Sequence, residues 1–174
     1  ASQSEDIQVQ NNHIVDGGAA VLCERCVRVN IANNQISNCR NGGIFVALCL
    51  ARAAIIGNRL NYVGAEGKNV LASSIACIFQ LGECHVESNE VLNTGVSKDE
   101  KVNPARTVGI GALFVLEARI ESNLVSYSDL LTRERTLEDR ALLMQGLIEI
   151  AFPLGATALR IGYSAQVSNN KFLG

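Results

Sequence analysis

Two short segments of the sequence each carry a pair of charged or titratable residues at the same spacing. One residue separates His85 from Glu87, and one residue separates Arg119 from Glu121. If both segments are strands, the members of each pair point to one face, and the two pairs can lie side by side. The four side chains could then supply a general acid, a general base and a charge clamp. They could equally form a solvated ladder of cross-strand ion pairs, the commoner origin of such groups.

Other residue types that carry chemistry show weaker patterns. His13 stands alone and is expected at the surface. The sequence contains no phosphate-binding loop, dinucleotide fingerprint, Ser-His-Asp signature or basic aromatic patch. We therefore expect no cofactor. The five aspartates are isolated from one another: Asp6, Asp16, Asp99, Asp129 and Asp139.

The six cysteines indicate a metal site only weakly. Cys23 and Cys26 form a single CxxC pair, which lacks the second pair or well-spaced histidine of a zinc site. Cys23, Cys77 and Cys84 occupy positions expected to face the core, where a thiol acts as a small hydrophobic group. We therefore interpret the cysteines as buried free thiols and expect no metal, with disulfides as the alternative. The remaining two are Cys39 and Cys49.

Length, composition and charge are typical of one globular domain spanning residues 1–174. The chain is 48% hydrophobic with 15 glycines and 2 prolines, as expected for a chain with a buried core. Its net charge of −2 gives no reason to expect a nucleic acid or an anionic membrane as partner. No apolar run reaches the roughly 18 residues of a membrane span, so we expect no membrane insertion. Because the sequence opens with Ala1 rather than methionine, we expect a piece of a larger protein.

A six-residue pattern, apolar-x-x-Asn-x-apolar, recurs along the whole chain and indicates its architecture. Successive asparagines are separated by 22, 24, 31, 34 and 47 residues, so the basic unit is about 22 residues with growing insertions. Such a repeat predicts stacked units, each burying its apolar side against its neighbours. The pattern is centred on Asn12, Asn34, Asn58, Asn89, Asn123 and Asn170.

Residues around each asparagine alternate with the period of a strand. Those five and three positions before it are apolar or small and should face inward, while those four and two positions before it are mostly polar and should face solvent. A second alternating run opens with a small residue about 15 residues before the asparagine, as in Gly43–Leu48 and Ser74–Phe79. Each unit should thus contain at least two short strands joined by tight turns.

These repeats resemble those of right-handed parallel β-helix proteins, the pectin-lyase-like superfamily, over nearly the whole chain. The resemblance implies an all-β solenoid of about six to seven short coils, with insertion loops on one flank. An asparagine at a tight bend tolerates left-handed backbone angles, and its inward amide can hydrogen-bond the amides of adjacent coils. We therefore expect the six asparagines to form a buried structural ladder.

The long interval between Asn123 and Asn170 allows two interpretations. A degenerate coil could be centred on Gly146, which takes the place of the asparagine in Leu143–Ile148. Alternatively, the interval could hold a polar insertion and one extra strand. Residues 126–140 are too polar for the strand that an additional coil needs there, which favours the insertion.

The resemblance also implies a place for catalysis. Pectin-lyase-like enzymes hold carboxylates, often with an Arg or Lys, on the outer face of one sheet, where the substrate sugar lies along the coils. His85, Glu87, Arg119 and Glu121 occupy outer positions of this kind. The adjacent Asp pairs, Gly-His-Gly and Asp clusters of those enzymes are missing, however. With no Trp, 3 Tyr and 5 Phe, the chain also has few aromatic residues to line a sugar cleft.

Three insertions should emerge on one flank of successive coils, where they could bind a polysaccharide or protein ligand or be tolerated surface loops. They cover residues 61–73, 94–107 and 126–140, the last with a short helix expected within residues 129–140. The ends of the stack show no covering helix, and uncovered strand edges predict end-to-end self-association.

We therefore expect a non-enzymatic structural scaffold or binding module for a carbohydrate or protein ligand. It would belong to a larger bacterial surface, secreted or appendage-type protein. The alternative is a polysaccharide lyase or glycoside hydrolase acting on the outer face of the β-helix. The resemblance favours an extracellular or cell-surface location, while the cysteine content leaves the cytoplasm open.

Overall fold

The chain is all-β with parallel sheets, as the sequence predicts. The computed structural model describes residues 4–66, 73–97, 108–126, 148–151 and 164–173. Within these ranges every regular element is a strand, and the strands form two parallel sheets. No helix among the described residues is both long and apolar enough to cross a lipid bilayer.

The smaller sheet consists of six three-residue strands that stack in chain order. They are β2 (His13–Val15), β5 (Gln35–Ser37), β8 (Arg59–Asn61), β10 (Glu90–Leu92), β12 (Leu124–Ser126) and β15 (Lys171–Leu173). Each strand begins directly after one of the repeated asparagines, so the motif marks entry into this sheet.

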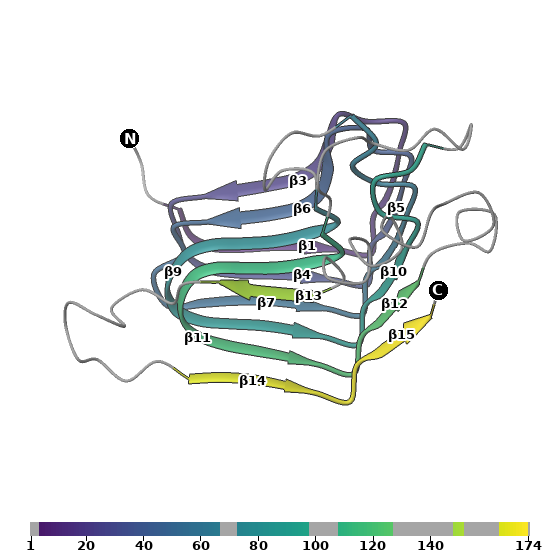
Figure 1. Ribbon diagram of the computed structural model, residues 1–174. Helices are drawn as coiled ribbons and strands as arrows, with labels where there is room; N and C mark the ends of the chain where they lie inside the picture. The colour runs from purple at the N-terminus through teal and green to yellow at the C-terminus, as the bar shows by residue number, and fades with distance from the viewer. Residues whose placement is uncertain (1–3, 67–72, 98–107, 127–147, 152–163, 174) are drawn as a thin grey trace.

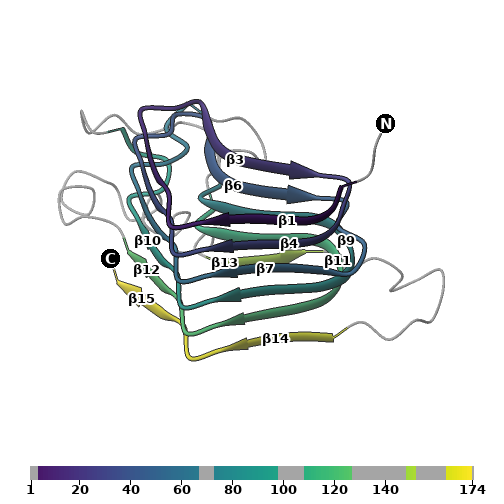
Figure 2. The ribbon, with the colours of Figure 1, turned by 180° about the vertical axis from the view of Figure 1, so that it is seen from behind.

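The larger sheet has nine strands. They are β1 (Ser4–Gln10), β3 (Ala19–Glu24), β4 (Cys26–Ala32), β6 (Gly42–Ala47), β7 (Arg52–Ile56), β9 (Ile75–Glu87), β11 (Ile110–Glu121), β13 (Ile148–Ala151) and β14 (Ser164–Ser168). The sheet folds over along a bend in β9 and β11, which Figure 1 shows. Their first halves continue the stack of β3 and β6, and their second halves continue the stack of β1, β4 and β7. Figure 2 shows the latter stack from behind, ending at β14.

Successive repeats form layers that pair with one another in a constant register. A middle layer contains three strand segments, such as β6, β7 and β8, where the sequence predicts at least two. The predicted inward positions are confirmed in the middle layers. Val29, Ala53, Cys84 and Ala118 are in register on four neighbouring strands, and all are buried. The apolar core therefore runs the length of the stack, because each layer contributes the same inward columns.

One backbone prediction at the asparagines was wrong. The left-handed conformation belongs to the residue before each asparagine and not to the asparagine itself. Bending the chain one residue earlier turns the asparagine side chain inward, where it can meet the next layer. The six left-handed residues are Asn11, Asn33, Gly57, Ser88, Ser122 and Asn169. Four of them are Asn or Gly, the types that tolerate these angles best.

The inward asparagines are hydrogen-bonded from layer to layer. Asn89 Oδ1 accepts hydrogen bonds from the backbone N–H and the Nδ2 of Asn58, at 2.9 and 3.0 Å. Asn89 in turn donates from its own N–H and Nδ2 to Asn123 Oδ1, at 2.9 and 3.0 Å. The same pair of contacts recurs between the other neighbours, from Asn12 to Asn170. The four middle asparagines are each 1% exposed, whereas Asn12 is exposed at one end.

The long interval between the last two asparagines contains an extra strand. Both β13 and β14 pair directly with β11, β13 with its first half and β14 with its second half. Both strands therefore belong to one layer. No additional layer separates this layer from β11 among the described residues, which agrees with the insertion and extra strand favoured by the sequence. The alternative motif around Gly146 lies outside the described residues, apart from Ile148.

Candidate functional sites

The charged residues singled out in the sequence come together on one face of the bent sheet. The register places Arg119 beside His85 and Glu121 beside Glu87, on the second halves of β9 and β11. On the other side of β9, Arg52 of β7 is paired with Glu83. We call the group of His85, Glu87, Arg119 and Glu121, with Arg52 and Glu83, the charged cluster.

His85 differs from the prediction that its column faces solvent, because its side chain is only 8% exposed. Three side chains lie against its ring. Its Nδ1 is 3.3 Å from Nη2 of Arg52, and its Nε2 is 3.2 Å from Oε2 of Glu87 and 3.5 Å from Oε1 of Glu121. Arginine only donates hydrogen bonds, so Nδ1 accepts, and the proton of a neutral ring resides on Nε2.

Ion pairs connect the rest of the charged cluster. Arg119 Nε lies 2.7 Å from Glu121 Oε1, and Arg52 Nε lies 3.1 Å from Glu83 Oε2. Both arginines remain about half exposed. Glu121 and Glu83 are thus each held by an arginine, and the contacts at His85 bring the two ion pairs together on this face of the sheet.

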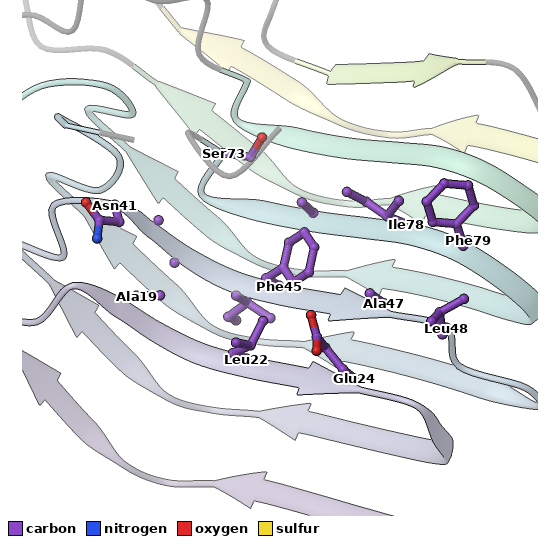
Figure 3. A pocket seen from close by; sticks show the side chains of 14 residues that line it. Ala19, Leu22, Glu24, Asn41, Phe45, Ala47, Leu48, Ser73, Ile78 and Phe79 are labelled. Atoms are coloured by element: carbon purple, nitrogen blue, oxygen red, sulfur yellow. The ribbon is translucent and has the colours of Figure 1, made fainter. Parts of the chain in front are cut away.

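A second site lies on the outer face of the sheet formed by β3, β6 and the first half of β9. It is a groove of about 590 Å³. Figure 3 shows Leu22, Phe45 and Ile78 side by side in it, projecting from three adjacent strands. Among the described residues that line the groove, Glu24 is the only charged one. The groove is therefore an apolar surface with one carboxylate.

An apolar ridge borders the groove at the bend of the sheet. We define it by Leu48, Leu50, Phe79, Leu81 and Phe114, which are 37–50% exposed. The rings of Phe79 and Phe114 are stacked with centroids 4.9 Å apart and planes 5° apart. Figure 3 shows Leu48 and Phe79 at one end of the groove. Leu22, which is 59% exposed, lines the same groove as Leu48 and Phe79. Exposed apolar residues grouped in this way usually mark an interaction site.

Three ridge residues have backbone angles that their types rarely adopt. Leu48, Phe79 and Phe114 have φ of 54–56°. A bulky residue in this region is a genuine outlier, and the conformation costs roughly 1–2 kcal/mol per residue. At the corner before the asparagines, by contrast, Asn, Gly and Ser occupy the same conformation. The ridge thus exposes large apolar side chains where small or polar residues would strain the backbone less.

The groove and the ridge were missed by the sequence analysis, although a signal was present. The second alternating run carries apolar residues at its outward positions as well, for example Leu22, Phe45 and Ile78. A bulky apolar residue, Leu48, Phe79 or Phe114, then ends each run in the middle layers. A sheet that is apolar on both faces needs a cover or a partner on its outer face.

No cysteine belongs to a group of three potential metal ligands among the described residues. All six cysteines are buried and free. Burial raises the pKa of the Cys23 thiol to about 11, and a hydrogen bond with Cys77 followed by burial raises that of Cys84 well above its ordinary value. Protonated buried thiols are unreactive, so these cysteines act as core residues.

The other predicted sites contribute little to the described surface. His13 is exposed on β2, as expected. The three insertions begin after β8, β10 and β12, which are adjacent strands of the smaller sheet. They therefore leave the stack from one flank, but most of their residues lie outside the described ranges, including residues 129–140, where a short helix is expected.

Comparisons with known proteins do not assign the chain. No model of a protein family, no curated protein and no solved structure matches it. Any functional conclusion therefore depends on the geometry of the chain itself.

Proposed function

We propose that the chain is a right-handed parallel β-helix of the pectin-lyase-like type and serves as a non-enzymatic binding module. Layers of parallel strands in constant register, joined by an asparagine ladder, support this fold. In a stack of this kind the inward columns provide stability, and function is left to the outer faces. The apolar groove and ridge are the outer surface that best fits binding.

The strained, exposed ridge is the observation that carries this proposal. Leu48, Phe79 and Phe114 combine a costly backbone conformation with large apolar exposure. Neither property stabilises the isolated chain. Residues that break local rules in this way are expected at functional positions, where a partner compensates for the cost.

The ligand is a protein segment with apolar side chains and a nearby Lys or Arg. Sugar sites need several converging polar groups, but the polar side chains lining the groove are few, mainly Glu24, Asn41 and Ser73. Phe79 and Phe114 also stack on each other, which occupies one face of each ring. Apolar side chains of a partner can fill the groove beside Phe45, and a cation of the partner can pair with Glu24.

A peptide selection tests this proposal. Random 12-residue peptides displayed on phage are selected on the immobilised 174-residue chain, and the affinities of enriched peptides are measured by fluorescence anisotropy. We expect enrichment of Leu, Phe and a basic residue. Leu22→Asn and Phe79→Asn should weaken binding at least tenfold, and Glu24→Gln should remove the preference for the basic residue.

Stability distinguishes a docking surface from a structural role. Phe79→Asn should leave the free energy of unfolding within about 1 kcal/mol of the wild-type value. Relief of the left-handed backbone is worth about 1 kcal/mol and offsets the loss of ring stacking, about 0.5–1.5 kcal/mol. Val15→Asn is the matched control, because Val15 is a similarly exposed apolar residue on β2. It should change neither the free energy of unfolding nor the affinity for the peptides. Peptides that bind the Leu22 and Phe79 variants as tightly as the wild type would refute the proposal.

The alternative function is a polysaccharide lyase or glycoside hydrolase acting at the charged cluster. The adjacency of His85, Glu87, Arg119 and Glu121 favours it, while the ion pair between Arg119 and Glu121 opposes it. A panel of uronate and neutral polysaccharides decides between them. Turnover by the wild type that disappears in Glu87→Gln or Glu121→Gln would establish the enzyme and displace the binding module.

A further inference from the structure

We propose that His85, Glu87 and Glu121 form a binding site for a divalent transition-metal ion, with Zn²⁺ as the best match. The three side chains share the outer face formed by the second halves of β9 and β11. One potential ligand atom from each lies within 4.8 Å of the other two. The site is separate from the groove and does not depend on its proposed docking function.

The buried Nε2 atom of His85 is the observation that indicates a bound ion. His85 Nε2 is buried, and it has no hydrogen-bond partner in the part of the chain that the structure describes. Its contacts with Glu87 and Glu121, at 3.2 and 3.5 Å, are close enough for ion pairing, but neither has the geometry of a hydrogen bond. Buried polar atoms are nearly always paired, so an unpaired ring nitrogen directed at two carboxylates needs an explanation. An ion bound between the three groups supplies one.

Two of the three separations between the ligand atoms are close to those of a tetrahedral site. Ligand atoms about 2.0–2.2 Å from a tetrahedral ion are roughly 3.3–3.6 Å from one another. The two distances from His85 Nε2, 3.2 and 3.5 Å, are close to this range. The two carboxylates need to approach each other, and Glu121 Oε1, which lies 2.7 Å from Arg119 Nε, must share its charge between this guanidinium and the ion. Glu87 is 37% exposed and retains freedom to move, while Glu121 is held at 12% exposure.

The ligand types select the ion. One imidazole nitrogen and two carboxylate oxygens suit Zn²⁺ and similar transition metals, whereas Ca²⁺ and Mg²⁺ prefer oxygen ligands alone. Three protein ligands leave at least one coordination position for water or for a group from a partner.

Arg52 opposes metal binding and gives the proposal a distinctive prediction. A metal-bound histidine normally donates its other ring N–H to an acceptor. Here Nδ1 faces Nη2 of Arg52, which can only donate. Binding therefore requires Arg52 to release His85 and keep its ion pair with Glu83, at 3.1 Å. Removing the guanidinium should therefore strengthen binding.

Calorimetric titration of the 174-residue chain with zinc chloride tests the site. We expect one Zn²⁺ per chain. His85→Gln and Glu121→Gln should weaken binding at least tenfold, Arg52→Gln should tighten it about threefold or more, and Ca²⁺ should bind at least a hundredfold more weakly than Zn²⁺. Glu90→Gln is the matched control, because Glu90 forms a similar surface ion pair with Arg59 on the smaller sheet. It should leave the affinity unchanged.

A spectroscopic measurement completes the test. Co²⁺ in place of Zn²⁺ should give the visible absorption of a tetrahedral site, and His85→Gln should abolish it. Equal Zn²⁺ affinity in the wild type and in Glu121→Gln would overturn the proposal, as would weaker binding by Arg52→Gln. If His85→Gln does not fold, as judged by circular dichroism, these two variants alone decide. Phe79→Asn, which tests the docking function, should bind Zn²⁺ normally, so the two proposals can fail separately.

Discussion

Replacing Asn89 with alanine is the sharpest test of what holds the stack together. The side chain of Asn89 makes four hydrogen bonds in a region that is almost fully buried. Its Oδ1 accepts from the N–H and the Nδ2 of Asn58, and its Nδ2 donates to the Ile55 carbonyl and to Asn123 Oδ1. Alanine removes all four bonds without offering a replacement.

The expected loss in the free energy of unfolding follows from the polar groups that lose a hydrogen-bond partner. The N–H of Asn58 loses the acceptor supplied by Asn89, and one of its Nδ2 hydrogens loses the same acceptor. Asn123 Oδ1 keeps its bond from the Asn89 backbone N–H. A buried unpaired donor costs about 1–3 kcal/mol. With water entering part of the space left by the amide, we expect the free energy of unfolding to fall by about 2–3 kcal/mol.

Urea unfolding followed by circular dichroism measures the change, and Asn12→Ala is the matched control. Asn12 is exposed at the end of the ladder, and within the described part of the chain its side chain only donates hydrogen bonds. Its loss should cost less than about 1 kcal/mol, because the groups left behind can bind water. An unchanged urea midpoint for Asn89→Ala, or equal losses for the two variants, would show that the ladder does not stabilise the stack as argued.

Three further predictions concern close packing, the thiols and the ends of the stack. Gly82→Ala should destabilise the chain by more than about 3 kcal/mol in thermal unfolding, because a Cβ there would lie 1.9 Å from the Ala51 carbonyl oxygen; an unchanged melting temperature would contradict this packing. Cys23 should react with Ellman's reagent only after unfolding. Because its folded pKa is raised to about 11 from 9.0, its contribution to stability should be present below about pH 9 and lost as the pH approaches 11, which unfolding midpoints across this range would detect. The 174-residue chain should self-associate in light-scattering measurements, since the inward column is open at β14, where Val167 is 50% exposed; a monodisperse monomer would argue against this.

The layered architecture could be predicted because every repeat carries the same local sequence pattern. Alternation before each asparagine specifies which residues face the core, and the asparagine column specifies the register between layers. Four of the six residues of the charged cluster could be placed on one face from their spacing, since His85 and Arg119 precede their asparagines by equal distances, as do Glu87 and Glu121. In a repeat structure, residues at equivalent positions of successive repeats therefore lie side by side.

Features that depend on contacts between layers could not be predicted in this way. His85 is buried among Arg52, Glu87 and Glu121, and Arg52 lies one layer away at a position whose equivalents differ in type. The left-handed residue was assigned to the asparagine because asparagine tolerates those angles, yet the bend occurs one residue earlier. Alternation assigns the inward face alone, so exposed apolar side chains such as Phe79 were missed, although both faces of that run are apolar.

Cross-linking from within the groove tests the proposed binding function most directly. A photoreactive benzoyl-phenylalanine in place of Phe45 would sit in the groove, and the same residue in place of Val15 would sit on the smaller sheet. Each variant is irradiated with the tightest peptide from the selection, and the products are mapped by mass spectrometry. We predict that the peptide is captured from position 45 and not from position 15. Equal capture from both positions, or capture from position 15 alone, would contradict the assignment of the groove as the docking surface.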